Sequence, residues 1–254
     1  MVSKGDTIAV WFSCGAASAA AAYETVRKYG DTANIRLLNN PVIEEDEDNL
    51  RFLEDVERWL GIEVESVTHP KYPSCSAREV WEHRRYMSGV AGAPCTSILK
   101  KEARQIWERQ NHYDHTVLGF TVDERKRHNN FTLTERPLLP VLIEEGYRKQ
   151  DCYNLLKRHG IQPPRMYQLG FPNANCVGCV KSGSVTYWNH VRKHFPEVFW
   201  DRAEQSRNIG ARLVKYKGTR IYLDELPPDA VGAPLKSMED VGCGSFCEEG
   251  SDAP

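Results

Sequence analysis

Eight cysteines give this chain its clearest capacity for chemistry, and four of them form two close pairs. Cys176 and Cys179 are separated by two residues, and Cys243 and Cys247 are separated by three residues near the end of the chain. Thiolates at this spacing can bind one metal ion or cluster without straining the backbone. The pairs therefore predict a metal site. A four-cysteine zinc site built from both pairs is one arrangement, and inert buried thiols are the alternative.

A second group of residues could bind an anion, because it joins a short apolar run to an alanine-rich stretch. This loop consists of Ser13, Cys14, Gly15, Ala16, Ala17 and Ser18. Small residues let backbone amides approach an anion, and a following helix directs its unpaired amides and positive dipole end at the same place. The loop is neither a Walker loop nor GxGxxG, yet its context predicts phosphate binding. A tight turn that needs small residues for packing is the alternative.

The sequence SCGAAS resembles the pyrophosphate loop, SGGxDS, of the adenine-nucleotide hydrolases. Together with later segments it resembles the phosphoadenosine phosphosulfate reductase family within that superfamily. The resemblance implies an α/β fold that binds an adenine nucleotide. Cys14 stands where the motif has a glycine, and Ala17 stands where it has an aspartate. Without that aspartate, we expect a sulfonucleotide as the ligand, or ATP bound differently from the way ATP-splitting members bind it.

Two further segments extend the resemblance to charged residues. GAPCTSILKKEARQ resembles the family segment in which a cysteine precedes a lysine, which would place Cys95 and Lys100 near the nucleotide. GFTVDERKR resembles the loop that bears an acid and basic residues, here Glu124, Arg125 and Arg127. The resemblance implies that these groups converge with residues 13–18 at the carboxyl ends of parallel strands, where the cations stabilise anionic oxygens. A solvated loop is the alternative for the ERKR run.

NCVGCVKSG resembles the second cysteine segment of the family, which in the cluster-binding reductases acts with an adjacent Cys-Cys in the first segment. Here Pro94 precedes Cys95, so Cys95, Cys176 and Cys179 supply three thiolates, and the tail pair offers a fourth. The resemblance implies an iron–sulfur cluster, with zinc as the alternative. GCGSF also resembles the reductase motif ECGxH, whose cysteine attacks the sulfonucleotide, so Cys243 is either a ligand or the nucleophile.

The elements that would position these residues alternate along the first part of the chain. Strands are expected at 7–12, 34–39, 62–67, 116–121 and 138–143, and helices at 16–29, 48–60, 97–109 and 148–159. Strands separated by amphipathic helices imply right-handed crossovers and a parallel sheet covered on both faces. We therefore expect a doubly wound α/β domain over residues 1–160. Its helix at 48–60 is expected to bury Leu50, Leu53, Val56 and Leu60. Cys152 should be a small buried hydrophobic residue.

The character of the sequence changes after residue 160. A proline-containing segment without strand or helix period leads to the first cysteine pair, and helices are expected near 185–194 and 197–206. A hairpin is expected within 211–226, with its turn at Lys217 and Gly218. Residues 161–254 are therefore expected to form a helical, cysteine-bearing extension that packs on the α/β domain.

The composition of the chain limits its possible binding partners. The chain has 254 residues and a formal net charge of −2, which argues against electrostatic binding of bulk nucleic acid. No stretch approaches the ~18 uninterrupted apolar residues of a membrane span, and the polar break after the first strand is unlike a secretory signal. We expect a cytoplasmic protein with no membrane partner, whose cysteines serve metal or redox chemistry rather than a disulfide framework.

These features predict an adenine-nucleotide enzyme of sulfur chemistry. In the reductase version, the loop at 13–18 binds the phosphates, a thiolate takes the sulfo group, and a thiol reductant is the partner. In an ATP-dependent version, the enzyme adenylates an acceptor such as a nucleic acid, and sulfur from a cysteine, a cluster or a donor protein displaces AMP. The alternative that is not an enzyme is a zinc-stabilised module that binds a nucleotide without catalysing a reaction.

Overall fold

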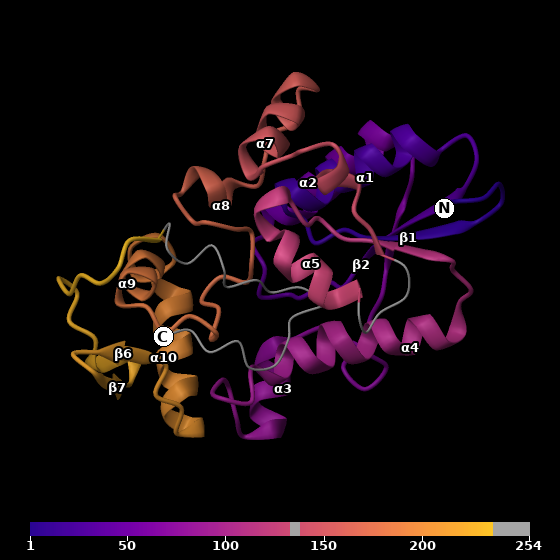
Figure 1. Ribbon diagram of the computed structural model, residues 1–254. Helices are drawn as coiled ribbons and strands as arrows, with labels where there is room; N and C mark the ends of the chain where they lie inside the picture. Colours follow the sequence, from indigo (N-terminus) through magenta and orange to yellow (C-terminus); the bar gives the residue numbers. More distant parts are fainter. Residues whose placement is uncertain (133–137, 236–254) are drawn as a thin grey trace. The chain divides into compact units, whose positions relative to one another are not determined.

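The computed structural model describes residues 1–132 and 138–235 (Figure 1). The chain divides into two compact units. Unit 1 comprises residues 1–40, 47–67 and 104–165, and unit 2 comprises 41–46, 68–103 and the described residues from 166 onward. The sequence suggested a single division at residue 160. The actual division is interleaved, because apolar residues of 41–46 and 68–103 belong to the same buried cluster as those beyond 166.

Unit 1 is a doubly wound α/β fold built on a five-stranded sheet with strand order β3-β2-β1-β4-β5. Its strands are β1 (Thr7–Trp11), β2 (Asn34–Asn39), β3 (Val64–Ser66), β4 (His115–Val117) and β5 (Leu138–Leu139). All neighbouring strands pair in parallel. The fold class expected from the sequence is therefore confirmed.

Helices cover both faces of this sheet, and α1 and α4 lie on opposite sides of β1 in Figure 1. The helical elements are α1 (Ala16–Tyr29), α2 (Asp48–Leu60), α4 (Ala103–Gln110), the 3₁₀ turn η2 (Val122–Glu124), α5 (Arg125–Thr132), α6 (Val141–Glu144) and α7 (Lys149–Arg158). On one face, alanines of α1 such as Ala19 and Ala22 are fully buried, because their small side chains let the helix approach the strands. On the other face, Trp107 of α4 packs edge to face on Trp11 of β1, with ring centroids 5.8 Å apart.

Two of the expected strands end about four residues early in the structure, and β1 and β3 are shortened by one and three residues. The fourth strand ends at Val117 rather than at residue 121, and the fifth ends at Leu139 rather than at residue 143. Pro140 explains the second difference, because it lacks the amide that would continue the ladder and instead precedes α6. The early end of β4 leaves residues 118–121 free to form the turn that leads into η2 and α5.

Unit 2 is mainly helical. Its elements are α3 (Ala77–Arg84), the π-helix η1 (Thr96–Glu102), α8 (Arg165–Gln168, which begins one residue earlier, in unit 1), α9 (Val185–His194), α10 (Pro196–Ile209), β6 (Val214–Tyr216), β7 (Thr219–Ile221) and the 3₁₀ turn η3 (Leu223–Glu225). The expected hairpin is confirmed. Lys217 and Gly218 have φ of 47° and 82°, and two positive φ angles are typical of a type I′ turn.

The prediction that Cys152 is a small buried hydrophobic residue is confirmed. It lies on α7 and is fully inaccessible to solvent. Burial raises the pKa of its thiol to about 12, so the side chain remains neutral and unreactive at physiological pH. Across the described part of the chain, the helices are all too short or too polar to cross a lipid bilayer.

Candidate functional site

The loop predicted to bind phosphate follows β1 directly and has an unusual backbone. Cys14 has φ of 54°, in the left-handed region that glycine adopts far more readily than other residues. This conformation accounts for the glycine that the resembling motif has at this position. The Cys14 side chain is 3% exposed, and the Nδ2 atom of Asn39, at the end of β2, lies 3.8 Å from its sulfur. The same Asn39 amide donates to the carbonyl of Phe12 at 2.7 Å and so fixes the start of the loop.

Ser18 closes the loop on itself. Its hydroxyl accepts hydrogen bonds from the backbone amides of Ser13 and Gly15, both at 3.2 Å, and donates to the carbonyl of Gly15 at 2.9 Å. Two of the amides that the sequence analysis assigned to an anion therefore already share one neutral acceptor oxygen in this structure. The loop therefore closes around the Ser18 hydroxyl, and its binding of phosphate stays a prediction.

Gly119 is a residue of this site that sequence reasoning missed. It follows β4, and a Cβ atom added to it would lie 2.7 Å from the backbone nitrogen of Ser18 and 2.8 Å from the carbonyl carbon of Ala17. Real Cβ atoms do not approach backbone this closely. The segment after β4 thus packs without a side chain against the first turn of α1. The only sequence signal is a glycine just after the fourth strand.

The position of this contact in the sheet is informative. The chain passes from β1 to β2 and β3 on one side and later returns to β4 on the other side of β1. Strand order therefore reverses between β1 and β4, and the carboxyl ends of these two strands form the topological switch point of the sheet. Open α/β sheets bind ligands at such a point. The loop at 13–18 and Gly119 both lie there.

The acidic and basic residues predicted near the nucleotide begin on the turn after Gly119. Glu124 accepts a hydrogen bond from the backbone amide of Thr121 at 3.4 Å and pairs with Arg127 at 3.2 Å. Part of the charge of Arg127 is therefore already opposed. Arg125 is exposed at the start of α5, and none of the carboxylates in the described ranges lies within ion-pair distance of it.

Lys100 lies in unit 2, and its role as a phosphate-binding lysine stays a prediction. It is 6% exposed, and its Nζ atom lies 3.0 Å from Oε1 of Glu45 in a largely buried ion pair. It also belongs to η1, a seven-residue π-helix where the sequence suggested an ordinary helix. π-Helical segments are rare and are frequent at functional sites. Glu45, 55 residues earlier in the sequence, could not be identified as its partner from spacing.

The cysteine pair of unit 2 forms a tight turn held by a buried tyrosine. Gly178 between the cysteines has φ of 67°, and an added Cβ would press against Val198 at 3.2 Å. The Tyr187 hydroxyl accepts from the backbone amide of Cys179 at 2.8 Å and donates to the carbonyl of Cys176 at 3.4 Å. Burial, followed by the charges of Cys179 and Cys176, raises the pKa of Tyr187 well above its usual value. This phenol therefore stays neutral and orders the turn.

Three predicted metal ligands belong to the hydrophobic core of unit 2 or pack against it. Cys176 and Cys179 are buried members of one cluster, and the half-buried Cys95 packs against it. Within residues 1–132 and 138–235, no three His, Cys, Asp or Glu side chains are arranged as a ligand set. Cys243 and Cys247 lie outside the described residues. The turn at Cys176–Cys179 fixes the backbone of two of the predicted ligands, and their binding of a metal stays a prediction.

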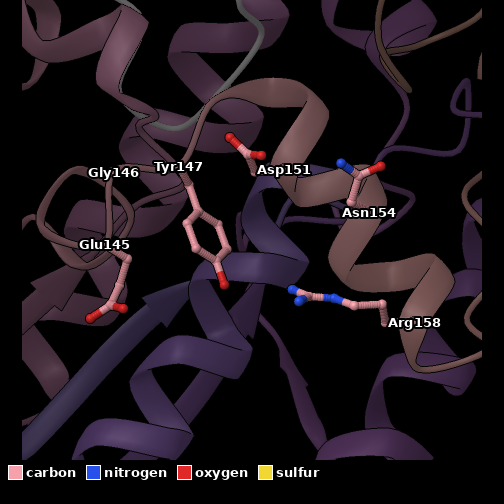
Figure 2. Close-up of a pocket in the computed structure, with 6 residues that line it drawn as sticks. All are labelled: Glu145, Gly146, Tyr147, Asp151, Asn154 and Arg158. Atoms are coloured by element: carbon pink, nitrogen blue, oxygen red, sulfur yellow. The ribbon is translucent and has the colours of Figure 1, made fainter.

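A cavity elsewhere in unit 1 has a different character (Figure 2). It has a volume of about 490 Å³ and is lined by Glu145, Gly146, Tyr147, Asp151, Asn154 and Arg158. Tyr147 and Arg158 point toward each other across it in Figure 2, but the Tyr147 hydroxyl donates to Glu24 at 2.8 Å, and Glu145 pairs with Lys28 at 2.9 Å. No residue of the loop at 13–18 lines this cavity, so it is distinct from the predicted site.

Comparisons with known proteins were made for the whole chain. No model of a known protein family matches it, and no curated protein sequence matches it either.

Proposed function

We propose that the chain is an adenine-nucleotide enzyme that carries out sulfur chemistry on a sulfonucleotide, as its resemblance to the phosphoadenosine phosphosulfate reductases implies. The observation that carries this proposal is the contact of Gly119 with the first turn of α1. It joins the small-residue loop after β1 to the segment after β4 at the switch point of a parallel sheet. That arrangement supports binding of a phosphate-bearing ligand.

The hydrogen bonds of the loop suggest how the phosphate is held. The Ser18 hydroxyl is the acceptor for the amides of Ser13 and Gly15. A phosphate oxygen can replace it as a stronger, charged acceptor, because charge-assisted hydrogen bonds are about twice as strong as neutral ones. Rotation of Ser18 about χ1 would then add its hydroxyl as a further donor. The dipole of α1 favours the anion at the same end.

One feature favours a sulfonucleotide over ATP with magnesium. Ala17 replaces the aspartate of the resembling motif, so the first turn of α1 has no acidic residue. Mg²⁺ prefers oxygen ligands and is held at such sites by carboxylates together with the substrate phosphates. A sulfonucleotide needs no metal bridge for its sulfo group to be attacked by a thiolate.

The proposed reaction places each group in a defined role. A cysteine thiolate attacks the sulfur of the sulfo group, the bond from that sulfur to the phosphate oxygen breaks, and the adenosine bisphosphate leaves. A thiol reductant then releases sulfite from the S-sulfocysteine and forms a disulfide. Cys243 is the candidate from the sequence and lies outside the described residues. Cys14, although it is in the loop, is too deeply buried at 3% exposure to be that nucleophile.

Arg125 provides the test of phosphate recognition. Because its guanidinium has no carboxylate partner in the described ranges, its full charge is available to a ligand. Replacing Arg125 with alanine should weaken the binding of adenosine 3′,5′-bisphosphate by about 1–3 kcal/mol, the scale of a hydrogen bond to a charged group. Calorimetric titration would measure this.

The controls separate phosphate recognition from a general effect. Arg109→Ala, at an exposed position near the end of α4, should bind the bisphosphate as the wild type does. Adenosine, which lacks phosphate, should bind equally to the wild type and to Arg125→Ala. An equal loss of affinity for adenosine and for the bisphosphate would contradict the role of Arg125.

A further inference from the structure

Two charged side chains that line the cavity in Figure 2 have no ion-pair partner among the described residues. Asp151 and Arg158 both belong to α7, and residues seven apart on an α-helix lie on one face, about two turns apart. Asp151 accepts a hydrogen bond from the backbone amide of Arg148 at 2.8 Å through Oδ2, so its Oδ1 atom is still available. Asn154 also lines the cavity, and its Oδ1 accepts from Gln150 at 3.2 Å, which leaves its amide nitrogen as a donor. The helix therefore presents one carboxylate, one amide donor and one guanidinium to the same cavity.

The other charged groups around this cavity compensate one another. Glu24 is 2% exposed, and it accepts hydrogen bonds from Nε of Arg27 at 2.6 Å and from the Tyr147 hydroxyl at 2.8 Å. Glu145 pairs with Lys28 at 2.9 Å. With these groups paired, the charges that remain in the cavity are one negative and one positive. A ligand that complements both must carry an ammonium group and an anionic group.

Tyr147 supplies an acceptor on the opposite side of the cavity, where Arg158 extends toward it in Figure 2. Its hydroxyl hydrogen is donated to Glu24, so its oxygen can act only as an acceptor. Burial, followed by the hydrogen bond to Glu24, raises the pKa of Tyr147 to about 12, so the phenol stays neutral. An ammonium group can therefore donate to this oxygen and to the Asp151 carboxylate. A carboxylate can accept from Arg158 and from the amide of Asn154.

An adjoining cavity adds an aromatic surface. It has a volume of about 390 Å³ and shares Tyr147 and Arg158 with the first cavity. Tyr23 of α1 and His159 at the end of α7 both line it, with ring centroids 4.9 Å apart. Trp59 stacks on Tyr23 at 4.9 Å with an interplanar angle of 11° and so holds its ring in place. An aromatic ring of a ligand can pack offset or edge to face on this surface.

We propose that the two adjoining cavities form a site for a free aromatic amino acid. Arg158 binds its carboxylate, and Asp151 binds its ammonium group together with the Tyr147 oxygen. Its ring packs against Tyr23. The volumes lie in the range of small-molecule sites, roughly 300–1,000 Å³. No residue of the loop at 13–18 lines either cavity, so this site is separate from the proposed nucleotide site and does not depend on it.

The test is a titration of the full chain with L-phenylalanine, followed by protein NMR. We expect saturable binding with a dissociation constant of about 1 mM or tighter. Phenethylamine lacks the carboxylate, and 3-phenylpropanoate lacks the ammonium group, so each should bind the wild type roughly 10–100-fold more weakly, as expected for a lost hydrogen bond between charged groups. In Arg158→Gln, L-phenylalanine and phenethylamine should bind alike. In Asp151→Asn, which keeps an oxygen for the Arg148 amide, L-phenylalanine and 3-phenylpropanoate should bind alike.

Lys157→Gln is the matched control, because Lys157 is exposed next to Arg158 and lines neither cavity. It should bind L-phenylalanine as the wild type does, and an equal loss in Lys157→Gln and Arg158→Gln would overturn the inference. So would a wild-type chain that binds none of L-phenylalanine, L-tyrosine and L-tryptophan at about 10 mM. Displacement of the amino acid by adenosine 3′,5′-bisphosphate would place it in the nucleotide site and overturn a separate one. Failure of the bisphosphate to bind would refute the proposed function alone.

Discussion

Gly119→Ala is expected to remove most of the nucleotide affinity of this protein. The new Cβ would lie 2.7 Å from the Ser18 nitrogen and 2.8 Å from the Ala17 carbonyl carbon, both of them backbone atoms that cannot rotate away. The loop after β1 must therefore shift. Each hydrogen bond to the charged phosphate that the shift breaks should cost about 1–3 kcal/mol of binding, and overpacking should also lower the free energy of unfolding by about 1–3 kcal/mol. Calorimetric titration with adenosine 3′,5′-bisphosphate and thermal melting would measure the two effects.

Gly183→Ala is the matched control for this prediction. A Cβ at Gly183 would meet only the carbonyl oxygen of Leu213 at 3.6 Å, an ordinary contact. This variant should bind the nucleotide and unfold as the wild type does. A folded Gly119→Ala variant that keeps its affinity within about twofold would show that the ligand does not use the loop as proposed, because a displaced loop cannot keep its contacts.

Cys176→Ser is expected to have the second large effect, loss of the metal. Tyr187 and Gly178 order the turn that carries Cys176 and Cys179, and we expect these two cysteines to bind one ion or cluster. Removing a ligand should weaken metal binding by more than the roughly 100-fold upper range for outer-shell partners. Metal analysis of anaerobically purified protein measures this directly. An iron–sulfur protein would also lose its brown colour, whereas a zinc protein would be colourless throughout.

Cys152→Ser provides the control for the loss of any cysteine. Cys152 is fully buried in unit 1, so its replacement by the more polar serine should lower stability but leave the metal content unchanged. Equal metal content in the wild type and Cys176→Ser would exclude Cys176 as a ligand. Loss of metal in both serine variants would indicate that unfolding, rather than ligation, explains the result.

The repeating pattern of unit 1 could be predicted from the sequence because its signals are local. The bounds of α1, β2 and α2 agree with the expected 16–29, 34–39 and 48–60. Gly61 ends α2 with φ of 67°, which glycine adopts without strain. The side that α2 buries could not be predicted in the same way. Leu50 is 66% exposed, whereas Phe52 is fully buried against Phe12, so a contact distant in sequence decides the orientation.

The interleaving of the two units also depends on distant contacts. Residues 41–46 and 68–103 lie between strands of unit 1 in the sequence, yet their apolar side chains belong to the core of unit 2. No local pattern separates them from the ordinary connections of an α/β fold. The π-helix at Thr96–Glu102 could not be predicted for a different reason. The apolar period of a single short helix does not distinguish a π-helix from the α-helix that we expect there.

In the candidate site, too, local sequence features could be predicted and contacts between distant residues could not. The loop at 13–18 was identifiable because a strand, small residues and a helix follow one another directly in the sequence. Its contact with Gly119 spans about a hundred residues and appears only when β4 is placed beside β1.

The most direct test of the account is an anaerobic calorimetric titration of the wild-type chain with phosphoadenosine phosphosulfate. We expect saturable binding at one site, with a dissociation constant of about 1 mM or tighter. Adenosine 3′,5′-bisphosphate should compete for it, and Gly119→Ala should abolish it. If neither the sulfonucleotide nor ATP binds at millimolar concentrations, the loop after β1 is a structural turn, and the proposed adenine-nucleotide function is wrong.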